Sequence, residues 1–298
     1  MLLRRANVNS AVRLPETVNE LIAHYKQHEL FEDGEKRSST RAVYTSFLKV
    51  YVGPAWGTLR LDQVNTLDVE KWLRSLNHAP GTKAKIRNIM SALFAHAKRH
   101  GMTLANPLQG VRCSSKRRRE PDVLTAVEFR VLLKELPQQE RVMVLLAGTT
   151  GLRRSELFAL KWEDIDFESL EIRVNKSCVR GELGATKTPG SAKPLPLHTV
   201  VAAALKEWKR STLYHRANDF LFPSIRKNGD IPVWPDMVLR KIIRPAATRA
   251  GIQGKTIGWH TFRHSTGTNL RSLGVDVKTA QERSAPFSTF ARNCGERK

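Results

Sequence analysis

Apolar residues in the first third of the chain recur at helical spacing in four places. The clearest stripe ends before Gly101 and consists of Ile86, Ile89, Met90, Leu93, Phe94 and Ala97. Shorter stripes follow a capping box at residues 17–20, a start at Ser39 or Thr40, and a start near Thr66. Gly53-Pro54 is expected to end the second helix. The pattern predicts a small bundle of four short helices within residues 15–111.

The rest of the chain mixes helical and strand patterns. A capping box at residues 125–128 opens a helix, the apolar run 141–147 is expected to break at 148–151, and a new helix begins near Arg153. Residues 170–174 and 193–197 alternate like strands, and further helices are expected around 197–209 and 234–250. The prediction is a mainly α fold with a small antiparallel β-sheet (α+β).

Residues 112–122 separate the two regions and are predicted to be a linker. Five of the eight residues from Arg112 to Arg119 are basic, and Pro121 follows. Lys116, Arg117, Arg118 and Arg119 could follow a phosphate backbone. A solvated hinge would have the same composition, and both roles can hold.

The charge points to a polyanionic partner. The 298 residues include 50 Lys and Arg against 28 Asp and Glu, a net charge of +22. Residues 1–122 contain 21 basic and 11 acidic side chains, and the remainder contains 29 and 17, so both halves are basic. Ribosomal and other RNA-binding proteins share this composition, as would a merely basic solvated surface.

Neither membrane insertion nor a cysteine framework is indicated. No apolar run approaches the ~20 residues of a membrane span, and no signal-peptide pattern opens the chain. Cys113, Cys178 and Cys294 are scattered singly, without the spacing of disulfides or zinc ligands. The expected location is the cytoplasm.

Four basic residues lie in segments that could address a phosphate. Arg153 lies in TGLRRSEL, Lys187 in TKT before KPLPL, and His260 and Arg263 in HTFRH. Residues three apart on a helix share a face, so His260 and Arg263 can reach one anion. Each also has a structural alternative: Arg153 could pair with Glu156 or Asp164, and Lys187 could be solvated on a hairpin. His264 is expected to be a packed or hydrogen-bonded core histidine.

Taken in this order, the motifs resemble the tyrosine recombinase (phage integrase) family. The resemblance covers about 270 residues and stops near Glu282. It implies a SAM-like helical core-binding domain at 15–111 after an arm at 1–14, and a catalytic domain at 123–282. Double-stranded DNA would be the partner, and family members act on it as homo-tetramers. Arg41, Thr82, Lys83 and Lys85 would then contact the DNA backbone, although a solvated face explains each one singly.

The resemblance also implies a reaction. Arg153 and Arg263 would hold the phosphate oxygens, Lys187 would protonate the leaving 5′-oxygen, and His260 would accept a proton or hydrogen-bond the phosphate. In the family a tyrosine forms a 3′-phosphotyrosyl link, without metal or other cofactor. The sequence likewise contains no Walker loop and no carboxylate cluster.

The chain departs from the family after Glu282. Residues 283–298 contain no histidine and no tyrosine, so the nucleophile and the His or Trp box before it are absent. The four tyrosines, Tyr25, Tyr44, Tyr51 and Tyr214, all precede His260. We expect a cleavage-defective recombinase without the terminal segment by which family members hold neighbouring protomers, or a non-catalytic DNA-binding protein derived from an integrase. RNA binding and a poorly folded fragment are weaker alternatives. An out-of-frame tail or a truncation in a decaying bacterial mobile element would explain residues 283–298.

Overall fold

A computed structural model describes residues 14–32, 36–115, 120–185 and 194–272 of the chain. The chain divides into two compact units, Met1–Glu120 and Pro121–Lys298, each with a hydrophobic core of its own. We call them unit 1 and unit 2. Lys187, Lys116, Arg117, Arg118, Arg119 and Cys294 lie outside the described residues.

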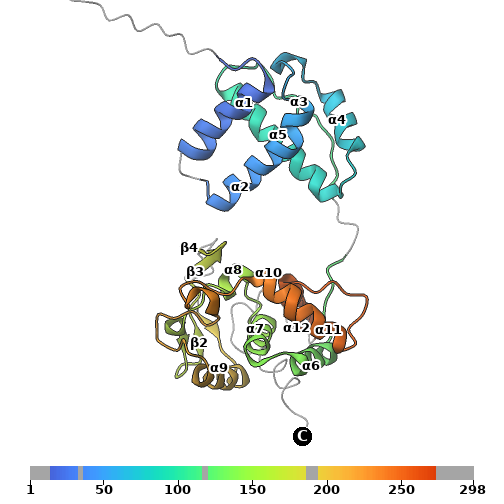
Figure 1. The fold of residues 1–298 in the computed structure, drawn as a ribbon. Coiled ribbons are helices and arrows are strands. Elements are labelled where there is room, and N and C mark those ends of the chain that lie inside the picture. The colour runs from blue at the N-terminus through green and yellow to red at the C-terminus, as the bar shows by residue number, and fades with distance from the viewer. Residues whose placement is uncertain (1–13, 33–35, 116–119, 186–193, 273–298) are drawn as a thin grey trace, which may run out of the picture. The chain divides into compact units, whose positions relative to one another are not determined.

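The described elements of unit 1 are helical. They are α1 (Val18–Tyr25), η1 (Lys26–Glu32), α2 (Ser38–Phe47), η2 (Leu48–Val52), α3 (Gly53–Trp56), η3 (Leu61–Gln63), α4 (Thr66–Ser75) and α5 (Pro80–Arg99). The predicted capping box forms, because Glu20 N–H donates to the Thr17 hydroxyl and Thr17 N–H donates to the Glu20 carboxylate. The predicted stripe of α5 is buried, and α5 contacts α1, α2 and η2 (Figure 1). The core of unit 1 is therefore built around α5.

The expected helix end at Gly53-Pro54 is wrong. Helical structure runs without a break from Ser38 to Trp56. The turn η2 is widened to π-helical spacing, in which Gly53 N–H donates to Leu48 O. Pro54 then lies in the first turn of α3, where a missing N–H removes no necessary bond.

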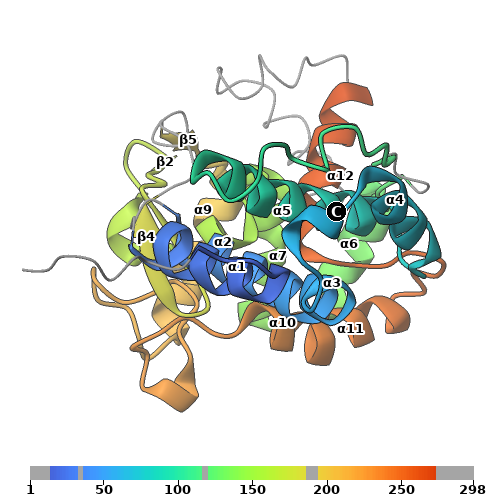
Figure 2. The same ribbon diagram turned by 90° about the horizontal axis from the view of Figure 1, so that it is seen from above.

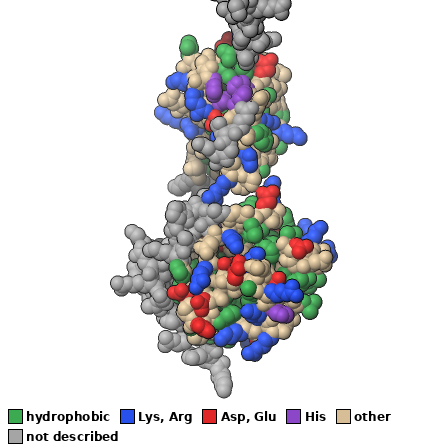
Figure 3. Space-filling model, turned by 90° about the vertical axis from the view of Figure 1, so that its left-hand side faces the viewer, with side chains coloured by type: hydrophobic (Ala, Val, Ile, Leu, Met, Phe, Trp, Pro, Cys, Tyr) green, Lys and Arg blue, Asp and Glu red, His purple; other side chains and the backbone are tan. Residues whose placement is uncertain are grey.

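Four histidines cluster where α1 and η1 meet α5. His24 Nδ1 lies 2.9 Å from His96 Nε2, and the rings of His28 and His100 contact the same pair. Figure 3 shows histidine side chains gathered on unit 1. His96 is only 1% exposed, and its Nδ1 lies 3.1 Å from the Glu29 carboxylate. Burial lowers the pKa of His96, the Glu29 hydrogen bond opposes this, and His100 and His24 lower it further.

Unit 2 combines helices with short strands. The helical elements are α6 (Ala126–Glu135), α7 (Gln138–Thr150), α8 (Arg154–Leu157), η4 (Trp162–Asp164), α9 (Thr199–Ser211), η6 (Ile225–Lys227), α10 (Pro235–Val238), η7 (Leu239–Ile243), α11 (Arg244–Arg249) and α12 (Trp259–Ser272). The helices α10 and α11 follow one another along one edge of the unit (Figure 2).

The strands form two small antiparallel sheets. They are β1 (Ile165–Asp166), β2 (Glu171–Ile172), β3 (Lys176–Val179), β4 (Glu182–Ala185) and β5 (Leu195–Pro196). The first sheet has the order β1-β2-β5, with Ile172 opposite both Ile165 and Leu195. The second is the β3-β4 hairpin, with Cys178 opposite Leu183. A mainly helical fold with a small antiparallel sheet is confirmed.

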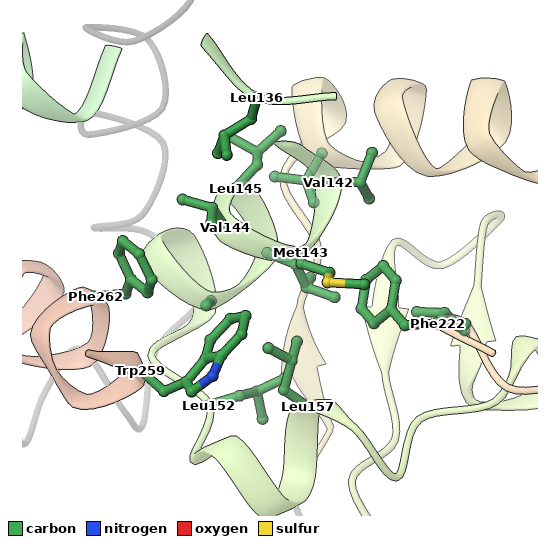
Figure 4. Packing of buried hydrophobic residues seen from close by; sticks show 14 of the residues in the cluster. Leu136, Val142, Met143, Val144, Leu145, Leu152, Leu157, Phe222, Trp259 and Phe262 are labelled. Carbon is green, nitrogen blue, oxygen red and sulfur yellow. The ribbon is translucent and has the colours of Figure 1, made fainter. Parts of the chain in front are cut away.

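The helix α7 is the centre of the unit 2 core. Its residues from Val142 to Thr149 are all buried, and Figure 4 shows Trp259 and Phe262 on one side of it and Phe222 on another. The predicted break at 148–151 is wrong in position, because the helix continues to Thr150 and ends at Gly151 with a φ of 64°. Gly148 serves close packing instead: a Cβ there would lie 2.3 Å from Phe129 Cζ.

The described residues contain no candidate membrane-spanning helix and no candidate metal site. None of their helices has the length and apolar character needed to cross a bilayer. Within the same residues, no group of three or more His, Cys, Asp or Glu could hold a metal ion, and Cys113 and Cys178 are free.

Candidate active site

Arg153 lies at the amino end of α8, directly after the left-handed turn at Gly151. Its backbone N–H and its Nη1 both donate to the Glu156 carboxylate, at 2.9 and 2.7 Å. Of the two pairing partners considered from the sequence, Glu156 is the one observed, while Asp164 accepts the Lys161 N–H. Glu156 is 4% exposed, whereas the Arg153 side chain remains 39% exposed. The guanidinium is thus anchored on one side and open on another.

Arg263 reaches the same place from α12. Its Nη1 donates to the carbonyl oxygen of Gly151, two residues before Arg153. Burial lowers the pKa of Arg263, the charge of Arg153 lowers it further, and Glu156 opposes both. Both guanidinium groups remain charged at neutral pH. Two positive charges that repel each other favour an anion between them.

His260 lies one turn before Arg263 on α12. Although the residue is exposed, partial burial of the ring is the largest cause that lowers the pKa of His260. The charges of His264, Arg154, Arg263 and Arg153 lower it further, in that order. A neutral imidazole beside these arginines can accept a proton or a hydrogen bond.

The position of α12 follows from the residues on its other face. Trp259 and Phe262 are buried against α7 (Figure 4). The Thr266 hydroxyl donates to Gly148 O at 2.6 Å, and the Ser265 hydroxyl accepts the Leu124 N–H at 2.7 Å. With that face fixed in the core, helical spacing turns His260 and Arg263 away from the core.

His264 is not a core histidine, which corrects the expectation. It is exposed, and its ring centroid lies 6.3 Å from that of His260. The i, i+4 spacing places the two rings on one side of α12, away from the buried Phe262. His264 therefore contributes charge near His260 and no packing to the core.

The other predicted site residues are not brought into this cluster by the described structure. Lys187 follows the β3-β4 hairpin, whose strand β3 contacts α8, but Lys187 itself lies outside the described residues. In unit 1, Arg41 lies on α2 and Thr82, Lys83 and Lys85 lie on α5, a helix that contacts α2. Lys83 donates to Arg74 O at 3.0 Å, while Lys85 is exposed with Nζ 5.4 Å from the centre of the Phe47 ring.

Sequence reasoning missed one charged pair at this site. Arg154 Nη1 lies 2.8 Å from Asp236 Oδ1, which joins α8 to α10. The adjacent arginines in TGLRRSEL were the available signal, but only the first was matched to a motif. Asp236 is distant in sequence and carries no local pattern.

Comparisons with known proteins show the family and the fold. The family model described as the phage integrase family matches residues 122–285. Tyrosine recombinase XerA of Pyrococcus furiosus is 27% identical over 252 residues, which cover 83% of this chain and 79% of XerA. The Tn1549 transposon integrase in complex with a circular intermediate DNA has a TM-score of 0.75 at 20% identity, covering 95% of this chain and 96% of that one. A lambda integrase tetramer bound to a Holliday junction has a TM-score of 0.68 at 20% identity, covering 95% and 79%. The chain shares the fold of both structures.

Proposed function

The chain belongs to the phage integrase family, and from this premise we propose that it binds double-stranded DNA and holds one backbone phosphate between Arg153 and Arg263. One observation supports this above all: Arg263, 110 positions after Arg153, donates a hydrogen bond to the carbonyl oxygen of Gly151, two residues before Arg153. Planar guanidinium groups match the geometry of phosphate oxygens. The net charge of +22 supports a polyanionic partner for the whole chain.

The family reaction assigns a role to each group in this proposal. A nucleophilic oxygen attacks the phosphorus, the bond to the 5′-oxygen breaks, and charge accumulates on the non-bridging oxygens. Arg153 and Arg263 would stabilise that charge, and neutral His260 would take the proton of the nucleophile or donate a hydrogen bond to the phosphate. Lys187 would supply the proton that the departing 5′-oxygen needs.

The nucleophile is the part of the reaction that this sequence does not supply. No tyrosine follows Arg263, and Tyr25, Tyr44 and Tyr51 belong to the helical unit 1. Tyr25 is 1% exposed, and its burial raises the pKa of its hydroxyl. In unit 2, the ring of Tyr214 packs against Gly229, where a Cβ would lie 2.5 Å from it. We therefore propose a DNA-binding protein of recombinase fold that does not form the phosphotyrosyl link.

A nicked suicide duplex tests both parts of the proposal. Binding is measured by fluorescence anisotropy, and covalent attachment by denaturing electrophoresis of the same mixture. We expect binding that weakens with salt and no covalent adduct. An adduct would refute the cleavage defect, and a lack of salt-dependent binding would refute the DNA-binding function.

Arg153→Gln and Arg263→Gln test the site within the same assay. Each removes one guanidinium that would contact the phosphate, so each is expected to weaken binding about 10-fold, on the scale of a hydrogen bond to a charged group. Arg249→Gln is the matched control, because Arg249 forms an exposed ion pair with Glu135 on another part of unit 2. Equal losses in all three variants would mean that only total charge matters.

The partner, the cellular location and the biological role are further proposals that follow from the family. For this chain we propose DNA as the partner, action in the bacterial cytoplasm, and a role connected with a mobile element. A tetramer is described for lambda integrase bound to a Holliday junction, and the assembly of this chain is a separate question. Sedimentation of the chain with and without duplex DNA would measure its own assembly.

A further inference from the structure

Arg154 is held in an ion pair that solvent can reach. Its Nη1 lies 2.8 Å from Asp236 Oδ1, and the two side chains are 47% and 60% exposed. An exposed pair of this kind contributes little to folding, typically below about 1 kcal/mol. The pair can therefore open without a large cost when a stronger anion arrives.

The pair lies beside the candidate active site. Asp236 is in the first turn of α10, and the Trp259 indole N–H donates to the carbonyl of the preceding Pro235 at 3.0 Å. The next residue after Trp259 is His260. The ion pair joins α8 to α10, and the Trp259 hydrogen bond joins the first turn of α12 to α10. Three elements thus meet where Arg154 and Asp236 pair.

The charge of Arg154 acts on the site in the free protein. It lowers the pKa of His260, and its contribution ranks above those of Arg263 and Arg153. A charge with that influence must lie within effective Coulomb range of the imidazole. The Arg154–Asp236 pair and the Trp259–Pro235 hydrogen bond place Arg154 next to the start of α12, which carries His260.

We propose that Arg154 is a third phosphate-binding guanidinium, which Asp236 holds in the free protein and which exchanges that carboxylate for a backbone phosphate of duplex DNA on binding. This inference rests on the proposed DNA-binding function and adds a second phosphate contact to it, next to the one held by Arg153 and Arg263. A carboxylate and a phosphate both accept two hydrogen bonds from one guanidinium, so the exchange needs no new geometry. Asp236 acts as a competing anion and not as a DNA contact.

Two properties distinguish this exchange from a purely structural ion pair. Loss of Arg154 should weaken binding, whereas loss of the Asp236 charge should strengthen it, because the guanidinium no longer has to leave a partner. If only total charge mattered, Arg249→Gln and Glu135→Gln would shift binding in the same two directions and by the same amounts. The second property is the number of counterions released, which falls when one phosphate contact is lost.

The test measures binding of the full chain to a duplex of arbitrary sequence at several KCl concentrations. Arg154→Gln, Asp236→Asn and the double variant are compared with Arg249→Gln and Glu135→Gln, a pair with 56% and 39% exposure and an N···O distance of 3.1 Å. We expect Arg154→Gln to lower the slope of log K against log salt by about 0.9, which corresponds to about fourfold weaker binding near 0.2 M salt. Asp236→Asn should bind more tightly than the parent, and the double variant should match Arg154→Gln.

Several outcomes would overturn the inference. These are an equal change of slope in Arg249→Gln, weaker binding by Asp236→Asn, or a double variant that binds more tightly than Arg154→Gln alone. Melting curves and NMR titration of His260 identify variants that fail to fold, and in folded Arg154→Gln the pKa of His260 should rise. If the parent itself shows no salt-dependent binding, the proposed function fails, whatever Arg154 does.

Discussion

Glu156 is the residue on which the position of Arg153 depends. Its buried carboxylate accepts both the backbone N–H and the Nη1 of Arg153, and it is the anion that opposes the lowered pKa of Arg263. Glu156→Gln keeps the shape but removes the charge. We expect a loss of about 1–3 kcal/mol in the free energy of unfolding, because two guanidinium groups lose their shared counter-charge.

Denaturant titration measures this change. Glu163→Gln is the control, since Glu163 pairs with Lys176 in an exposed position and should cost less than about 0.5 kcal/mol. A similar small cost for Glu156→Gln would show that the buried pair contributes no more than a surface pair.

His260 gives the site a predictable pH dependence. Its pKa is lowered in the free protein by burial and by neighbouring positive charges. A bound phosphate would offset those charges, so DNA binding should take up a proton at His260. Affinity is then expected to rise as the pH falls below about 6.5, the ordinary histidine value.

Binding isotherms between pH 7.5 and 5.5 measure this effect. His260→Gln should flatten the pH profile of binding. His215→Gln should leave the profile unchanged, because the observed hydrogen bond of His215 is to Thr212 O and not to the arginine cluster. An unchanged profile in His260→Gln would assign the proton uptake to other groups.

The sequence predicted three residues of the candidate site but not the ion pair beside them. Motif order singled out Arg153, His260 and Arg263. Arg263 bonds to the carbonyl oxygen two residues before Arg153, and His260 lies one turn earlier on α12. The sequence could not predict the Arg154 and Asp236 pair, because 82 residues separate the partners and an ion pair leaves no periodic trace.

Among the elements, α7 depends on close contact at Gly148. A Cβ at this position would lie 2.3 Å from Cζ of Phe129, which is 1% exposed. We expect Gly148→Ala to destabilise unit 2 by about 1–3 kcal/mol through overpacking. Thermal unfolding followed by circular dichroism measures the change.

A second glycine in a helix supplies the control. In α12, a Cβ at Gly267 would meet nothing within 4 Å, so Gly267→Ala should stabilise its helix by up to about 1 kcal/mol. Adding Phe129→Leu to Gly148→Ala should recover part of the loss. No recovery would mean that the ring is not the source of the strain.

The junction of α1, η1 and α5 should lose stability in mild acid. His96 is buried with a lowered pKa, and the groups that face it are His24, His100, Tyr25, Glu29 and Arg99. The unfolded chain takes up a proton at His96 near pH 6.5, while the folded chain resists it. The free energy of unfolding of unit 1 should therefore fall by about 1 kcal/mol between pH 7 and 5.5.

The lowered pKa of Glu29 adds a further loss, which begins only as the pH falls below about 4.5. Chemical denaturation at several pH values resolves the two steps. His96→Gln should reduce the first step, and His264→Gln, an exposed position in unit 2, should leave it unchanged.

Element boundaries show where sequence patterns stop being informative. Capping boxes were predictable at Thr17 and Thr125, because they depend on residues three apart in the chain. Gly53 and Gly148 were interpreted as breaks, yet one lies in a continuous helix and the other packs against a ring. Gly53 follows a widened helical turn, and Gly148 makes a tertiary contact with Phe129. Neither feature can be predicted from the neighbouring residues in the sequence.

For the molecule as a whole, two separate cores imply two unfolding events. Leu93 lies in the core of unit 1 and Leu146 in that of unit 2, both without exposed surface. Leu93→Ala should lower the free energy of unfolding of unit 1 by about 2–5 kcal/mol, and Leu146→Ala that of unit 2 by a similar amount. In calorimetry each variant should move one unfolding transition to lower temperature and leave the other in place. Equal shifts of both transitions in either variant would show that the units unfold as one.

Composition and periodicity predicted a division into two regions, both of them basic. Both arginine-bearing segments, in contrast, converge on the end of α7 through contacts that only the folded chain reveals. Gly151 offers its carbonyl to Arg263 and leads directly into Arg153. Both arginines are therefore positioned by this one helix end and not by the long segment that connects them. Insertions or deletions in the exposed loops of that connection should be tolerated. Related chains can therefore differ widely in length there and still keep the same anion-binding site.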